Sequence, residues 1–174
     1  YIKKNILDIY PVQKPVTLVP GGSERQYSVY NGLKALPEDA EIVAIHDGAR
    51  PLVTPQVIQK CVESALKWGA GVAGMPVKDT IKEADPDGRV RKTLRRESLW
   101  QVQTPQTFRY TLIMEAHRKA LEDNYIATDD SALVEYLGRQ VYMIPGGYDN
   151  IKITTPEDID IAWRILKSRQ GELL

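Results

Sequence analysis

Short apolar runs and segments with helical spacing alternate along the first half of the chain. The runs predict buried strands, and the spaced segments predict amphipathic helices. Thr54 followed by Pro55 is a strong helix start, because Thr can cap the first turn and Pro fits the first helical position. In order, the predicted elements are a strand at 16–19, a helix at 24–36, a strand at 42–45, a helix that starts at 54–55 and runs to about 68, and a strand at 72–77. This alternation predicts an α/β fold with a doubly wound parallel sheet.

The second half of the chain resumes a regular pattern after a polar interruption. Apolar spacing predicts a helix at 109–124, with His117 on its exposed side. Thr128 is predicted to cap the next helix, which carries two acids in its first turn and ends at Gly138. The remaining predicted elements are strands at 141–144 and 150–154 and a helix that starts at 155 and runs to about 169.

The polar interruption is rich in lysine and arginine. Strand-like segments at 79–84 and 89–94 flank Asp85-Pro86-Asp87-Gly88, which predicts a hairpin. So polar a hairpin cannot be a core strand pair, and an isolated two-stranded hairpin is only marginally stable in water. We therefore expect an arm that packs on a second copy of the chain, with a plain surface hairpin as the alternative.

The strand at 42–45 ends in a charged turn, His46-Asp47-Gly48-Ala49-Arg50-Pro51. In open α/β sheets, ligands bind at the carboxyl ends of the strands. Asp47 and Arg50 are therefore well placed to meet a metal-bound or phosphorylated ligand. The alternative is a surface turn in which the acid caps a helix and the arginine is solvated, and spacing alone leaves both readings open.

A second candidate site follows the first predicted strand, at Gly21-Gly22-Ser23, where Ser23 is predicted to cap the helix. A strand, a glycine pair and a helix N-terminus together direct unpaired backbone N–H groups toward one spot. Such a spot can receive a polar or anionic ligand. Ordinary turn chemistry is the alternative.

The charges of the chain balance, with 23 Lys and Arg against 23 Asp and Glu. A formal net charge of zero gives no global reason to expect binding to nucleic acid or to a membrane. No stretch approaches the ~20 apolar residues of a membrane span. The single cysteine, Cys61, excludes a disulfide within the chain and a cysteine-based metal site. A reduced, cytoplasmic setting fits these features.

Affinity for anions must therefore come from individual cations. Arg25, Arg50, Arg96 and Lys152 each lie beside a predicted turn or strand end. Arginine suits bidentate phosphate contacts and lysine suits a point charge, although taken singly each cation is better explained as a solvated surface charge. Asp47 could hold a divalent cation, but one acid is weak evidence for a metal site. The chain has no Walker A loop and no G-x-G-x-x-G motif.

An ordered series of motifs is similar to one known family. The series consists of 21–28 (GGSERQYS), 46–51 (HDGARP), 76–80 (PVKDT), 96–100 (RESLW), 103–106 (QTPQ), 128–129 (TD) and 150–158 (NIKITTPED). In this order it resembles the 2-C-methyl-D-erythritol 4-phosphate cytidylyltransferases of the non-mevalonate isoprenoid pathway. The resemblance implies a homodimeric, Rossmann-like nucleotidyltransferase with helices on both faces of its sheet and an inserted dimerisation arm at 78–103.

The resemblance also implies a reaction and a nucleotide site. The phosphate of methylerythritol phosphate would attack the α-phosphorus of CTP in the presence of Mg²⁺ and release pyrophosphate. Gly22 and Ser28 would recognise the cytosine. Asp47 and Gly48 would lie at the ribose and at the metal–phosphate edge, and Lys152 would sit beside the α-phosphate and position the nucleophile.

The same resemblance places the acceptor site at the base of the arm. Arg96 would hold methylerythritol phosphate across the dimer interface. Thr80, Arg50 and Thr128 would line that pocket. Positioning and charge neutralisation would supply most of the catalysis, since two polyanions must be brought together.

Two departures from the family pattern stand out. The family commonly has an acid at the position of Tyr27, so a contact there is lost or replaced. The family also begins with a strand and a glycine-rich loop whose Arg and Lys grip the triphosphate, and nothing similar precedes Val16. We therefore expect 1–174 to be a single, N-terminally truncated domain of such an enzyme. Two alternatives stay open: a ribitol 5-phosphate cytidylyltransferase, and an inactive unit for dimerisation and partial binding.

Overall fold

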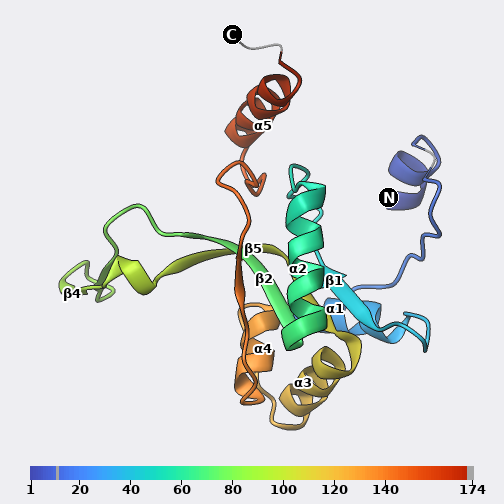
Figure 1. Ribbon diagram of the computed structural model, residues 1–174, viewed down its shortest axis with the longest axis horizontal. Coiled ribbons are helices and arrows are strands. Elements are labelled where there is room, and N and C mark those ends of the chain that lie inside the picture. The colour runs from blue at the N-terminus through green and yellow to red at the C-terminus, as the bar shows by residue number, and fades with distance from the viewer. Residues whose placement is uncertain (11, 172–174) are drawn as a thin grey trace. The chain divides into compact units, whose positions relative to one another are not determined.

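The computed structural model describes residues 1–10 and 12–171. The chain divides into two compact units between Glu38 and Asp39. The first unit contains a short π-helix, η1 (Lys3–Leu7), and the helix α1 (Arg25–Lys34). The second unit contains every strand of the described residues and the helices α2 to α5 (Figure 1).

Two predictions for the first unit are wrong. The segment 16–19 forms no strand, and its apolar side chains are exposed. A strand needs a neighbour for its backbone N–H and C=O groups, and the described residues of this unit offer none. Helix α1 starts one residue later than predicted: its N-cap is Glu24, not Ser23, and the Glu24 side chain makes no capping hydrogen bond.

The second unit is built on a four-stranded sheet in the order β1-β5-β2-β6. Its strands are β1 (Ile42–Ile45), β2 (Ala70–Pro76), β5 (Trp100–Arg109) and β6 (Met143–Pro145). Strands β2 and β6 are parallel, but β5 runs antiparallel to both of its neighbours. The prediction of a purely parallel sheet is therefore wrong. The reason is the arm, because a chain that leaves along β2 and turns back in a hairpin must return beside β2 in the opposite direction.

Helices cover both faces of this sheet, as the predicted Rossmann-like fold requires. Helix α2 (Pro55–Trp68) begins at the N-cap Thr54, as predicted. It lies so close to β2 that a Cβ on Gly71 would approach the Cβ of Ser64 to 2.6 Å. Thr107 of β5 is paired with Gly71, so its neighbour Gln106 faces the other side of the sheet, where α4 (Asp130–Tyr136) begins.

Two details near α4 differ from the sequence prediction. Asp129, not Thr128, is the N-cap, and its carboxylate accepts the Ala132 N–H at 2.8 Å. His117 is buried rather than exposed, because α3 (Tyr110–Glu122) packs against α4. Its Nε2 lies 3.6 Å from Oδ1 of Asp130, also buried.

The C-terminal elements confirm one prediction and correct another. Helix α5 (Pro156–Arg169) begins with a capping box between Thr155 and Asp158. The predicted strand at 150–154 is not a strand in the structure. This segment is held instead by individual bonds, such as the Ile153 N–H to the carbonyl of Ala49 at 2.8 Å.

The predicted hairpin is present as β3 (Lys82–Ala84) and β4 (Val90–Thr93), followed by the 3₁₀ turn η2 (Arg96–Ser98). Every residue of the two strands is exposed, and the hairpin extends away from the four-stranded sheet (Figure 1). Among residues 1–10 and 12–171, no helix is long and apolar enough to cross a bilayer.

Candidate functional site

Strand β5 carries four buried polar side chains, and three of them bond to loops of the second unit. Gln103, Thr104 and Gln106 are 7%, 4% and 1% exposed. A buried polar group is costly unless it is hydrogen-bonded, and each of these three bonds to a different loop of the second unit. The strand therefore fixes three loops to one another, and these loops carry most of the residues that the resemblance implicates.

The first loop is the charged turn after β1. The Thr104 hydroxyl accepts the Asp47 N–H at 3.0 Å and lies 3.0 Å from Nδ1 of His46. The other nitrogen of that imidazole, Nε2, lies 3.0 Å from the carbonyl of Arg50. One tautomer satisfies all three contacts: Nε2–H donates to Arg50, and Nδ1 accepts from Thr104. The start of the turn is thus bonded to β5 through Thr104, and its end is bonded back to its start through the contact between His46 and the Arg50 carbonyl.

The second loop, 146–152, follows β6. The Gln103 side chain donates to the carbonyl of Gly147 at 2.8 Å. Asn150 is 1% exposed and donates to Gln103 Oε1 at 3.2 Å and to the Thr104 carbonyl at 2.9 Å. These bonds fix the backbone two residues before Lys152.

The two loops bring three charged side chains together. Lys152 Nζ lies 3.1 Å from Oδ2 of Asp47, and Arg50 Nε lies 3.7 Å from the same oxygen. Arg50 also donates from Nη1 to the carbonyl of Asn150 at 2.8 Å. Burial lowers the pKa of Arg50, and the adjacent Asp47 opposes that shift. Two cations thus share one carboxylate and have charge left for an anionic ligand.

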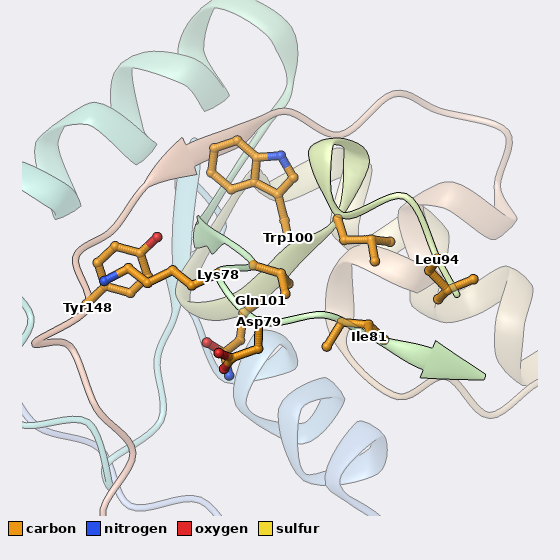
Figure 2. A pocket seen from close by; sticks show the side chains of 9 residues that line it. Lys78, Asp79, Ile81, Leu94, Trp100, Gln101 and Tyr148 are labelled. Atoms are coloured by element: carbon orange, nitrogen blue, oxygen red, sulfur yellow. The ribbon is translucent and has the colours of Figure 1, made fainter. Parts of the chain in front are cut away.

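Arg50 and Lys152 face a cavity of about 330 Å³. Gln101 and Tyr148 also line it. These two residues extend into a second cavity of about 500 Å³ at the base of the arm, with Trp100, Ile81 and Leu94 on its walls (Figure 2). At its edge the Lys78 Nζ stands 3.3 Å from the centre of the Tyr148 ring.

The arm brings together two further residues that the resemblance implicates. Thr80 and Arg96 both line a cavity of about 390 Å³. Arg96 is oriented by its bond from Nη1 to the carbonyl of Lys78 at 2.8 Å. Thr128 lies elsewhere in the second unit, immediately before the N-cap of α4, and its side chain is exposed. The start of α4 is held by Gln106, whose side-chain oxygen accepts the N–H groups of residues 130 and 131.

The glycine turn of the first unit has a defined geometry. The Gly22 N–H donates to the Ser28 hydroxyl at 2.9 Å. A Cβ on Gly22 would lie 2.4 Å from the Cβ of Tyr27, so the position requires glycine. Gly48 in the second unit is different, because a Cβ there would meet nothing within 4 Å.

The described part of the chain contains no group of three or more His, Cys, Asp or Glu residues that could bind a metal ion. Asp47 is the acid at the cavity site, and its carboxylate is engaged by Lys152. A single carboxylate fits an ion that arrives on substrate phosphates better than a metal held by the protein alone.

The sequence matches the profile of the 2-C-methyl-D-erythritol 4-phosphate cytidylyltransferase family over residues 3–168. The chain belongs to this family. It is 53% identical over 173 residues to the enzyme of that name from Pelotomaculum thermopropionicum, covering 99% of this chain and 73% of the relative. It is 52% identical over 167 residues to the one from Caldanaerobacter subterraneus, covering 96% of this chain and 74% of that relative.

Solved structures of the family share the fold. The 4-diphosphocytidyl-2C-methyl-D-erythritol synthase of Anaerococcus prevotii gives a TM-score of 0.85 at 38% identity, over 95% of this chain and 73% of that one. The cytidylyltransferase of Thermus thermophilus gives 0.79 at 33% identity, over 90% of this chain and 79% of that one.

Sequence reasoning assigned no role to five polar residues that organise the site. His46, Gln103, Thr104, Gln106 and Asn150 all lie inside the motifs that carried the resemblance. A local signal existed for three of them, since polar side chains at 103, 104 and 106 interrupt a segment that leads into a buried Phe108. For His46 and Asn150, the partners lie about fifty residues away, and only the fold reveals them.

Proposed function

We propose that the chain transfers the cytidylyl group of CTP to 2-C-methyl-D-erythritol 4-phosphate in isoprenoid precursor biosynthesis. Family membership makes it a nucleotidyltransferase, and the shared cavity of Arg50 and Lys152 supports the specific reaction. A phosphate oxygen of the acceptor attacks the α-phosphorus of CTP. The bond from that phosphorus to the β-phosphate bridge breaks, and pyrophosphate leaves.

Lys152 is the residue we assign to the reacting phosphorus. Its ammonium lies 3.1 Å from Asp47, and nearly half of its side chain surface is exposed, so it can reach a ligand without unfolding the turn. As a compact cation it neutralises charge that develops on the α-phosphate oxygens. Asp47 keeps it extended toward the cavity, and with the exposed Gly48 it forms the edge that we assign to the ribose and phosphates.

The acceptor phosphate is assigned to arginines. Arg50 and Arg96 each have one guanidinium nitrogen committed to a backbone carbonyl, which orients the rest of the fork for bidentate contact. Thr80 shares the cavity of Arg96 and supplies a hydroxyl. Thr128 is assigned to the same pocket on the resemblance.

Dimerisation through the arm is part of this proposal. The arm residues 78–103 include an exposed two-stranded hairpin, which gains stability by packing against a second chain. An arm from the partner subunit would then deliver its Thr80 and Arg96 to the cavity of Arg50 and Lys152. A homodimer is thus expected to be required for activity.

The cytosine site is assigned to the first unit. Ser28 accepts the Gly22 N–H, which holds the glycine backbone in place. The Gly22 carbonyl and the Ser28 hydroxyl can then bond to the edge of the base. Mg²⁺ would be held by the phosphates of CTP and by Asp47, and it supplies charge neutralisation at the triphosphate. A cytoplasmic location fits soluble, charged substrates.

The test is release of pyrophosphate by the protein made from its complete reading frame. With CTP, Mg²⁺ and methylerythritol phosphate we expect turnover, and with ribitol 5-phosphate as the acceptor we expect little. Turnover with ribitol 5-phosphate alone would overturn the choice of acceptor. Pyrophosphate release by residues 1–174 alone would refute the alternative of an inactive unit.

A further inference from the structure

His46 was left without a role by the sequence, yet its side chain bonds both to the charged turn and to strand β5. Its imidazole joins the carbonyl of Arg50 to the hydroxyl of Thr104, with both distances at 3.0 Å. The same hydroxyl accepts the N–H of Asp47 at 3.0 Å. The imidazole of His46 therefore links Arg50 directly, and Asp47 through Thr104, and these are the two residues of the turn that the proposed reaction uses.

The span of this ring sets the shape of the turn. Asp47 and Arg50 are already linked by a backbone bond of 2.9 Å, from the Arg50 N–H to the Asp47 carbonyl. That bond constrains the N–H of Arg50 but not its carbonyl. The carbonyl is oriented by the hydrogen bond that it accepts from His46 Nε2–H. The opposite edge of the ring is bonded to Thr104 of strand β5. The guanidinium of Arg50 then reaches Asn150 at 2.8 Å.

We infer that His46 is a positioning residue for the proposed transfer reaction, acting through Arg50 and Asp47 and not by touching the substrates. The inference rests on the proposed function for its kinetic part. The neutral ring carries its proton on Nε2, because the Arg50 carbonyl can only accept a hydrogen bond; Nδ1 then accepts from the Thr104 hydroxyl. Displacing the turn by about 1 Å lowers kcat/KM by roughly a hundredfold, the scale known for misplaced catalytic groups.

Two isosteric substitutions separate the two bonds of the ring. The amide nitrogen of Gln in His46→Gln occupies the place of Nε2, so it keeps the bond to Arg50. The amide oxygen of Asn in His46→Asn occupies the place of Nδ1, so it keeps the bond from Thr104. His46→Ala loses both, and Thr104→Val removes the hydroxyl at nearly constant volume.

The kinetic test is a double-mutant cycle in the protein from the complete reading frame. We expect His46→Ala and Thr104→Val each to lower kcat/KM, and the double variant to lose no more than the worse single one. We also expect His46→Gln to restore KM for the acceptor toward the wild-type value, because it keeps the Arg50 carbonyl in place. Losses that multiply in the double variant, or a His46→Gln variant no better than His46→Ala, would overturn the inference.

A spectroscopic test does not depend on the reaction. The chain contains two histidines, so the ¹⁵N-labelled protein has two sets of imidazole signals, and His46→Gln removes one set. The set that disappears belongs to His46, and it must show a proton on Nε2, the nitrogen that faces the Arg50 carbonyl. An unprotonated Nε2 would refute the positioning role even in an active enzyme, because that nitrogen could not then donate to the Arg50 carbonyl. The correct tautomer in a protein that fails to use CTP would instead count against the proposed function.

Discussion

Lys152 gives the sharpest test of the site, because its loss should separate activity from stability. In Lys152→Ala the ammonium that lies 3.1 Å from Asp47 disappears, while Asp47 keeps Arg50 at 3.7 Å as a second cation. The carboxylate is therefore never left alone. We expect the fold to survive this substitution and the reaction to suffer.

The two effects differ in size for a physical reason. In water, two unit charges at the 3.1 Å separation of Lys152 and Asp47 attract by about 1.3 kcal/mol. The lysine side chain is 47% exposed, and exposed pairs contribute only about 0.2–1 kcal/mol once desolvation and side-chain entropy are counted. A cation aimed at developing charge in a closed site is worth more, about 2–4 kcal/mol, or roughly thirtyfold to a thousandfold in kcat.

The assay combines urea unfolding with steady-state release of pyrophosphate. Lys119→Ala is the matched control, because Lys119 pairs with Asp123 at 2.8 Å and its side chain is also 47% exposed. Both variants should lose less than about 1 kcal/mol of unfolding free energy. Lys152→Ala alone should lose turnover. Normal turnover in Lys152→Ala, or an equal loss in Lys119→Ala, would refute the assignment of Lys152 to the α-phosphate.

Three further predictions follow from the structure. Arg96→Ala should raise KM for methylerythritol phosphate by about thirtyfold or more while KM for CTP changes little; an unchanged acceptor KM in initial-rate measurements would show that the arm does not bind it. Burial raises the pKa of Cys61 to about 11, so Ellman's reagent at pH 8 should label the thiol only after urea unfolding, and rapid labelling of the native protein would contradict this. The backbone N–H groups of Thr154 and Thr155 lower the pKa of Asp158 below 3.8. Its folded pKa is depressed, so its contribution is present above pH 3.8 and is lost as pH falls through the lower value. Chemical unfolding should therefore show a difference between the wild type and Asp158→Asn at pH 6 that shrinks near pH 3.

Helices were the part of the fold that could be predicted most closely. The bounds of α2 agree with the prediction made from Thr54, Pro55 and the apolar spacing. Those of α5 agree with the helix start predicted at Thr155 to Asp158. Caps and amphipathic spacing act between residues three or four apart, so the sequence carries them locally. Strand pairing is not local. Nothing at 100–109 indicates that this segment becomes the central strand β5, antiparallel to both neighbours.

Capping at α4 shows where local reasoning ended. Thr128 and Asp129 are both good cap residues, and the sequence does not rank them. The choice falls to Asp129 because the buried Gln106 of β5 donates to its carboxylate at 2.9 Å. His117 was predicted to be exposed because the sequence does not show that α4, a later helix in the chain, packs against it.

The sequence by itself determined the family, the helices, the polar arm and the identity of the cations Arg50, Arg96 and Lys152, because composition, periodicity and ordered motifs are properties of the chain. The tertiary structure alone decided which cations meet. Arg50 and Lys152 are about a hundred residues apart, and the buried side chains of Thr104 and Gln103 in β5 bring their loops to one carboxylate. Hydrogen bonds between distant segments depend on three-dimensional distance, which no spacing along the chain encodes.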